Sequence, residues 1–130
     1  MKGNLRLVSV ISALAGVALA AAASPQALSQ AQGGLWQVER DGSTPVRLCI
    51  ANPLALALFE HRGSKCSQKV IRDGGTSATI HYTCAGSNFG QSDLTLVTPR
   101  SLRVTTQGIS ANAPFKYTFQ ARRVGDCPAH

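Results

Sequence analysis

The sequence lacks the short motifs by which many enzymes are identified. It has no Gly-x-Ser-x-Gly nucleophile motif and no Cys-x-x-Cys pair. No spacing among its three histidines, His61, His81 and His130, is typical of a zinc site. We therefore expect no metal and no cofactor, and a protein that binds rather than catalyses.

Acidic residues are also scarce. Six Asp and Glu residues stand against thirteen Lys and Arg in a chain of 130 residues, which gives a net charge of +7. Most of the acids fall at predicted turns or strand ends, where Asp bonds to the local backbone. A hydrolase site built from two carboxylates is therefore the lesser alternative. With two tyrosines and no stacking motif, nucleic acid is not expected as a partner.

The apolar stretch at residues 7–20 is shorter and richer in alanine than a transmembrane helix, which needs about 20 strongly apolar residues. Lys2 and Arg6 precede this stretch, and a run of alanines follows it, as in a cleaved secretory signal. We expect a periplasmic or secreted protein. The predicted organisation is a signal peptide at 1–23, a disordered lead-in at 24–32 and a single domain at 33–128.

A turn signal lies at Gly74 and Gly75, because glycine adopts positive φ without steric cost. Runs of β-forming residues flank it on both sides. If residues 74–76 form the loop, the numbers of every facing pair sum to 150, and Val70 faces Ile80. The pattern therefore predicts a β-hairpin of known register.

This register places Cys66 opposite Cys84. Facing residues of antiparallel strands have Cβ atoms about 4.5–5.5 Å apart, which is close to the distance that a disulfide requires. We therefore predict a Cys66–Cys84 bridge, which leaves Cys49 to pair with Cys127, and two buried free thiols are the alternative. Two bridges in a small exported domain also fit the oxidising compartment.

Alternating apolar residues predict about seven short strands and no βαβ unit. A second hairpin is predicted with pairs that sum to 200, so that Leu96 faces Val104. An even number of unpaired residues is expected between Thr106 and Phe115. Asn52, as an N-cap before a proline, predicts one short helix that ends near Gly63. The predicted fold is mainly β, an antiparallel meander that is curled or closed into a small barrel.

The chain resembles the small exported bacterial proteins catalogued as domain of unknown function thirty-six seventeen, over roughly residues 33–128. The motifs that carry the resemblance are Gly34-Leu35-Trp36, Val46-Arg47-Leu48-Cys49-Ile50, the pair Cys66 and Cys84 around a glycine-rich turn, and Arg122-Arg123-Val124-Gly125-Asp126-Cys127-Pro128. The resemblance implies an exported compartment and disulfides. It implies no catalytic residue, because the family carries no established activity.

Two candidate sites follow from the residues that remain. The basic residues predicted to form an anion-binding patch are Lys69, Arg72, Arg100, Arg103, Arg122 and Arg123. The aromatic residues predicted to line a pocket are Trp36, Tyr82, Tyr117 and Phe119. A solvated outer face is the alternative for the basic residues, and a core anchor is the alternative for Trp36.

Three function hypotheses follow. The first is an exported, non-catalytic protein that binds a small ligand or an anionic envelope component, such as a lipid headgroup or a glycan phosphate. The second is an inhibitor or interaction protein that acts on a secreted or periplasmic protein through a protruding loop at residues 87–89. The third is a small periplasmic hydrolase, which would require the scattered acids or histidines to converge.

Overall fold

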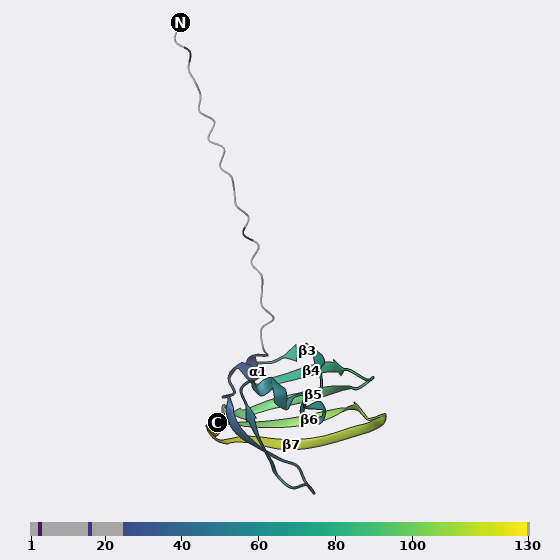
Figure 1. Ribbon diagram of the computed structural model, residues 1–130. Helices are drawn as coiled ribbons and strands as arrows, with labels where there is room; N and C mark the ends of the chain where they lie inside the picture. The colour runs from purple at the N-terminus through teal and green to yellow at the C-terminus, as the bar shows by residue number, and fades with distance from the viewer. Residues whose placement is uncertain (1–2, 4–15, 17–24, 130) are drawn as a thin grey trace.

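The computed structural model describes residues 3, 16 and 25–129. The predicted signal peptide therefore lies outside the described residues, apart from two glycines. Seven antiparallel strands form one sheet in the order β2-β1-β7-β6-β5-β4-β3 (Figure 1). The strands are β1 (Gly34–Glu39), β2 (Val46–Ile50), β3 (Cys66–Asp73), β4 (Ser77–Cys84), β5 (Phe89–Thr98), β6 (Ser101–Ser110) and β7 (Ala113–Gly125).

The mainly β prediction is confirmed, and the sheet is open rather than closed into a barrel. Strands β3 to β7 form a meander in which each strand pairs with the next. Strand β7 then pairs with β1, and β2 and β3 form the two edges of the sheet. The hairpin of β1 and β2 crosses β7 obliquely and runs out beyond it (Figure 1).

One face of the sheet, called the inner face below, is covered by three short helical segments. These are α1 (Gln26–Ser29) and the 3-10 helices η1 (Pro53–Leu56) and η2 (Phe59–His61). The buried hydrophobic side chains of the inner face are Trp36, Val38, Ile50, Ala78, Ile80, Tyr82, Leu94, Leu96, Leu102, Val104, Phe119 and Ala121. The side chains that alternate with them point to the opposite face, called the outer face, which no described segment covers.

The predicted disordered lead-in is wrong for the part that the structure describes. Residues 26–29 form α1, in which Ala27 is 0% and Leu28 is 2% exposed. The backbone N–H of Gln26 donates to the carboxylate of Asp73, at 3.0 and 3.1 Å from its two oxygens. The segment is ordered because Leu28 fills one end of the core and the first turn is tied to the β3–β4 hairpin.

The predicted helix after Asn52 is replaced by the two 3-10 helices. Asn52 accepts a hydrogen bond from Leu54 N at 3.1 Å, so the predicted cap is present. The segment is fixed to the sheet by buried polar contacts, in which Ser92 donates to the carbonyl of Ala57 and His61 bonds to Tyr82 at 3.0 Å. These contacts hold the two 3-10 helices against the sheet, where the sequence alone predicts one continuous helix.

Both ring nitrogens of His61 are engaged in hydrogen bonds. His61 Nε2 donates to the carbonyl of Ile109 at 2.9 Å, because a carbonyl can only accept. In the neutral imidazole, Nδ1 then accepts from the hydroxyl of Tyr82. The pair joins η2 to both β4 and β6, and His61 is only 5% exposed.

The register predicted for the β3–β4 hairpin is confirmed from Cys66↔Cys84 to Val70↔Ile80. A bulge then shifts the pairing by one residue, so that Arg72 faces Thr79. Gly75 has φ +80 in the turn, as the glycine-rich signal predicts. The bulge adds a residue on one strand only, and for that reason the sum rule fails next to the turn.

The register predicted for β5 and β6 is wrong by two residues. Leu96 pairs with Leu102, and Leu94 pairs with Val104. The reason is a bulge between Leu96 and Thr98 beside a tight turn. A slip of two residues leaves every side chain on the same face, so the predicted inward set remains correct.

The loop between the last two strands has two unpaired residues, Ala111 and Asn112, with φ of 49° and 63°. The predicted even number is therefore confirmed. Gly108 and Pro114 lie within β6 and β7, where they face Phe115 and Ile109.

Both predicted disulfides are present. Cys66–Cys84 joins β3 to β4 with a Cα–Cα distance of 4.0 Å, and Cys49–Cys127 joins β2 to the segment after β7 with 5.4 Å. None of the described cysteines is free. The first bridge staples one hairpin, and the second closes the N-terminal hairpin onto the end of the chain.

We predict that the second bridge contributes more stability. The two bridges span 78 and 18 residues, and a longer closed loop restricts the unfolded chain more. Replacing Cys49 and Cys127 with alanine should lower the free energy of unfolding by about 4.5 kcal/mol, against about 3 kcal/mol for Cys66 and Cys84. Urea unfolding without reductant measures both, and a larger loss for the hairpin pair would contradict the loop-length argument.

Candidate functional site

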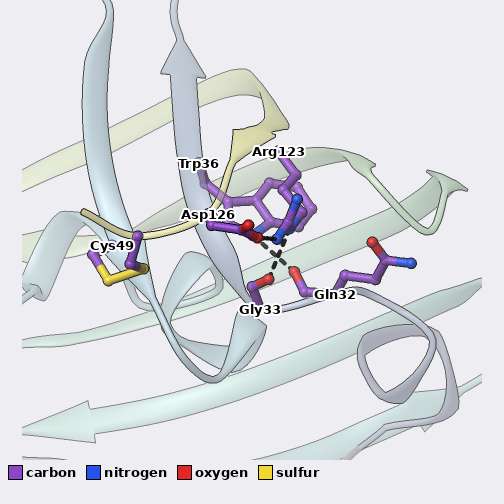
Figure 2. Close-up of a disulfide and its surroundings, with 7 residues drawn as sticks. Gln32, Gly33, Trp36, Cys49, Arg123 and Asp126 are labelled. Carbon is purple, nitrogen blue, oxygen red and sulfur yellow. Dashed lines mark hydrogen bonds and ion pairs between the residues drawn. A yellow bond between two sulfur atoms is a disulfide. The ribbon is translucent and has the colours of Figure 1, made fainter. Parts of the chain in front are cut away.

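Arg123 occupies a structural position beside the Cys49–Cys127 bridge (Figure 2). Its Nε donates to the carbonyl of Gly33 at 2.8 Å, and its guanidinium pairs with Asp126. A Cβ at residue 34 would lie 2.5 Å from Arg123 Nε, and Gly34 has φ +148. A Cβ there would also lie 2.7 Å from the carbonyl oxygen of Gly125, so glycine is required by the backbone conformation and by the close approach of β7 as well as by Arg123.

Trp36 lies in the same cluster and is a core residue. Its indole Nε1 donates to the carbonyl of Gln32 at 2.9 Å, and the side chain is 0% exposed (Figure 2). Trp36 and Arg123 are directly opposite each other in β1 and β7. The core-anchor alternative for Trp36 is confirmed.

The structure does not bring the six predicted anion-binding residues onto one face. Arg123 shares the inner face with Trp36, and its side chain is only 11% exposed. Arg100 lies in the β5–β6 turn. The four that lie on the outer face are Lys69, Arg72, Arg103 and Arg122.

The outer face is nevertheless basic, because two more cations join these four. Among the described strands it carries six cationic side chains against two carboxylates, Glu39 and Asp93. The six cations are Arg47, Lys69, Arg72, Arg103, Lys116 and Arg122. Most of the other outer side chains in the paired central strands are threonine, serine or glutamine.

Part of this charge is neutralised locally. Arg122 forms an ion pair with Glu39 at 3.2 Å, and Gln37 donates to the same carboxylate at 2.6 Å. Arg47 donates in turn to Gln37 Oε1 at 2.9 Å. Asp93 accepts a hydrogen bond from Thr79 at 2.6 Å. Lys69, Arg103 and Lys116 form no ion pair within residues 25–129.

A shallow groove of about 410 Å³ crosses the outer face at the end where the β4–β5 and β6–β7 turns lie. We call it the outer groove. One wall is a polar row in which Lys116, Gln107, Gln91 and His81 face each other in sequence across β7, β6, β5 and β4. The opposite wall and the floor are formed by Phe89, Ile109 and Pro114, and by Gly90, Gly108 and Phe115.

The outer groove was not predicted from the sequence. Its signal was the outward-facing residues of the alternating strands, since Gln91 and Gln107 become neighbours only when β5 and β6 are paired with the correct register. The predicted register of β5 and β6 differed from the observed one by two residues, so it did not place Gln91 opposite Gln107.

The predicted aromatic pocket is not formed. Trp36, Tyr82 and Phe119 are 0%, 0% and 1% exposed and belong to the core. Tyr117 is instead half-buried and lines a separate cavity. Its ring lies under the guanidinium carbon of Arg40 at 4.2 Å, and its hydroxyl donates to Glu60 at 2.6 Å.

This second cavity, called the end cleft, has a volume of about 560 Å³ and is lined by Arg40, Asp41, Glu60 and residues 114–118. It lies where β1 leaves β7, because β1 pairs with β7 only from Gln120 onward. Burial raises the pKa of Tyr117, and the hydrogen bond to the Glu60 carboxylate raises it further. Burial likewise raises the pKa of Tyr82.

The acids and histidines do not form a metal-binding group within the described residues. Asp41 and Glu60 line the end cleft together, but two cations, Arg40 and Lys116, line it with them and Glu60 is engaged by Tyr117. A hydrolase of the paired-carboxylate type needs one acid that can donate its proton to the substrate. This arrangement gives the hydrolase hypothesis no support.

The expected protruding loop at 87–89 is a tight turn. Asn88 donates to the carbonyl of Ala85 at 3.1 Å and accepts from Ala111 N at 3.2 Å. The turn is therefore tied to the neighbouring β6–β7 turn, and it gives the inhibitor hypothesis no support.

A family model described as a protein of unknown function (DUF3617) matches residues 28–127. No curated protein and no solved structure matches the chain significantly. Among the described residues, no helix has the length and apolar character needed to cross a membrane.

We predict that both tyrosines stay neutral in the folded protein above the ordinary tyrosine pKa of 10.0. The unfolded chain releases these protons at a lower pH than the folded protein does. The contribution of the two tyrosines to the free energy of unfolding is therefore fully present below pH 10 and is lost as the pH rises above it. Tyr117→Phe should make this fall shallower. Ultraviolet titration of tyrosinate with parallel unfolding measurements tests the prediction, and tyrosinate in the folded protein near pH 10 would contradict it.

Arg122 and Arg123 offer a matched pair for a second prediction. Arg123→Ala should destabilise the protein by about 2 kcal/mol, because a nearly buried charged donor and its two acceptors lose their hydrogen bonds. Arg122→Ala should cost less than about 1 kcal/mol, because its ion pair with Glu39 is 59% and 43% exposed. Thermal or urea unfolding compares them, and equal losses would refute the structural role of Arg123.

Proposed function

The chain belongs to the DUF3617 family of proteins of unknown function, and we propose that it is an exported protein that binds an anionic component of the cell envelope through the outer face. The main support for this function is the uncovered outer face, whose described strands carry six cationic side chains and two carboxylates.

Export is supported by the two disulfides. Disulfides form and persist in oxidising compartments such as the periplasm and the extracellular space. One bridge joins β3 to β4, and the other joins β2 to the segment after β7. The basic n-region and apolar stretch at residues 1–23 point the same way.

Anion binding is supported by the way that the charges are spread. A large face with one predominant sign of charge raises the local concentration of oppositely charged partners. Lys69 and Lys116 lie at opposite ends of one row across the strands, and Arg103 lies between them on β6, two rows away. The face therefore suits an extended anionic surface or polymer better than a single small ion.

The predicted consequence is binding that depends on salt and on the outer face. The purified protein should bind dextran sulfate and phosphatidylglycerol vesicles at low salt. Binding should weaken as salt rises, since exposed charges are screened over ~8 Å at physiological ionic strength. Reversing Lys69 and Arg103 to Glu should weaken binding at least about tenfold, since each basic residue near an anionic surface contributes about 1 kcal/mol.

The matched control reverses Lys65 and Arg100 to Glu, which changes the net charge equally but at exposed positions outside the strands of the outer face. This control should retain most of the binding. Co-sedimentation and fluorescence titration at two salt concentrations provide the measurement. Absence of binding at low salt, or equal loss in both double variants, would refute a role for this face.

A further inference from the structure

The outer groove differs from the rest of the outer face, because it combines a polar wall with an apolar one. The polar wall holds two amides, Gln91 and Gln107, between His81 and Lys116. No side-chain hydrogen bond within residues 25–129 engages any of the four. Each amide offers two donors and an acceptor, so the row can both donate to and accept from a ligand.

The opposite wall is apolar and partly aromatic. Phe89, Ile109 and Pro114 face each other across β5, β6 and β7. Phe89 is 43% exposed, which is unusual for a large aromatic ring on an otherwise polar face. Such a wall can stack on the C–H face of a sugar ring, while amides across the groove bond to its hydroxyl groups.

The floor of the groove is rigid. Gly90 packs against Tyr82, and a Cβ at residue 90 would collide with the tyrosine hydroxyl. Tyr82 is in turn bonded to His61, which is fixed to the carbonyl of Ile109. A groove backed by a satisfied buried network is already formed before a ligand arrives, which lowers the entropic cost of binding.

Charge and size restrict the ligand further. No acid lines the outer groove, whereas Lys116 and His81 stand at opposite ends of its polar wall. The polar row crosses four strands, a span of about 14 Å at the usual strand spacing. The volume of about 410 Å³ falls within the range of small-ligand sites. These dimensions suit a short run of sugar units that carry negative charge.

We propose that the outer groove is a saccharide-binding site, and that the partner of the outer face is a saccharide bearing carboxylate or phosphate groups. The inference rests on the proposed function and makes it specific. A lipid surface fits less well, because membrane-binding surfaces press apolar side chains into the lipid, whereas Phe89, Ile109 and Pro114 line a groove.

Two variants at the groove and one matched control test this inference. Gln107→Ala removes an exposed amide from the polar wall, and Phe89→Ala removes the aromatic ring from the other wall. Gln120→Ala is the control, because it removes the same side chain from the outer face of β7 outside the groove. Circular dichroism establishes that each variant is folded, and Gln107→Ala carries the test if Phe89→Ala is not.

The probes are a galacturonate tetramer, a phosphorylated mannan fragment and poly-glutamate, measured by calorimetry at low salt. At least one of the two saccharides should bind, and each groove variant should weaken its binding about tenfold or more. The Gln120→Ala control should leave it unchanged. Poly-glutamate has no sugar ring, so its binding should be the same in all three variants. Backbone amide signals of Gly90 and Gly108 should shift with the saccharide and not with poly-glutamate.

Two negative results have different meanings. If poly-glutamate or vesicles bind but the saccharides do not depend on the groove residues, the groove assignment is overturned and anion binding by the outer face stands. If no anionic probe binds at low salt, the proposed function fails and the groove assignment fails with it.

Discussion

The guanidinium of Arg123 is the contact on which the architecture depends. It joins the end of β7 to the backbone before β1, through Gly33, and it pairs with Asp126 one residue before the Cys49–Cys127 bridge. The β1–β7 ladder is what attaches the N-terminal hairpin to the meander. Strand β1 brings Trp36 to the inner face, which the five-stranded meander of β3 to β7 would otherwise lack.

With the β1–β2 hairpin attached to β7, the inner face of the sheet provides most of the hydrophobic core. The inner face buries large side chains from most of the strands, and α1, η1 and η2 complete the cover. A small domain gains little stability from its core alone, and the two disulfides add to it. The outer face is therefore not needed for packing, and it can carry unpaired cations, amides and an exposed aromatic ring.

Much of this arrangement could be predicted from alternation and from one hairpin. The glycine turn set the β3–β4 register and both disulfides, and the period of two identified the inward residues. The bulges beside the turns at Ile71 and Val97 could not be predicted, because a bulge adds a residue without a clear signal in composition. The separation of Arg122 from Arg123 was available from the sequence, since neighbouring strand residues point to opposite faces.

The two faces are not independent, because one register orders both. Ser92 bonds to Thr106 inside the core at 2.9 Å, and this pairing of β5 with β6 also sets Gln91 beside Gln107 on the outer face. A slip of one residue would bury the glutamines and expose the leucines of the same strands. The energy that the core gains from its register therefore also fixes the order of polar groups along the outer groove. The surface chemistry is in this sense encoded by the buried residues, which specify the neighbours that each exposed side chain has.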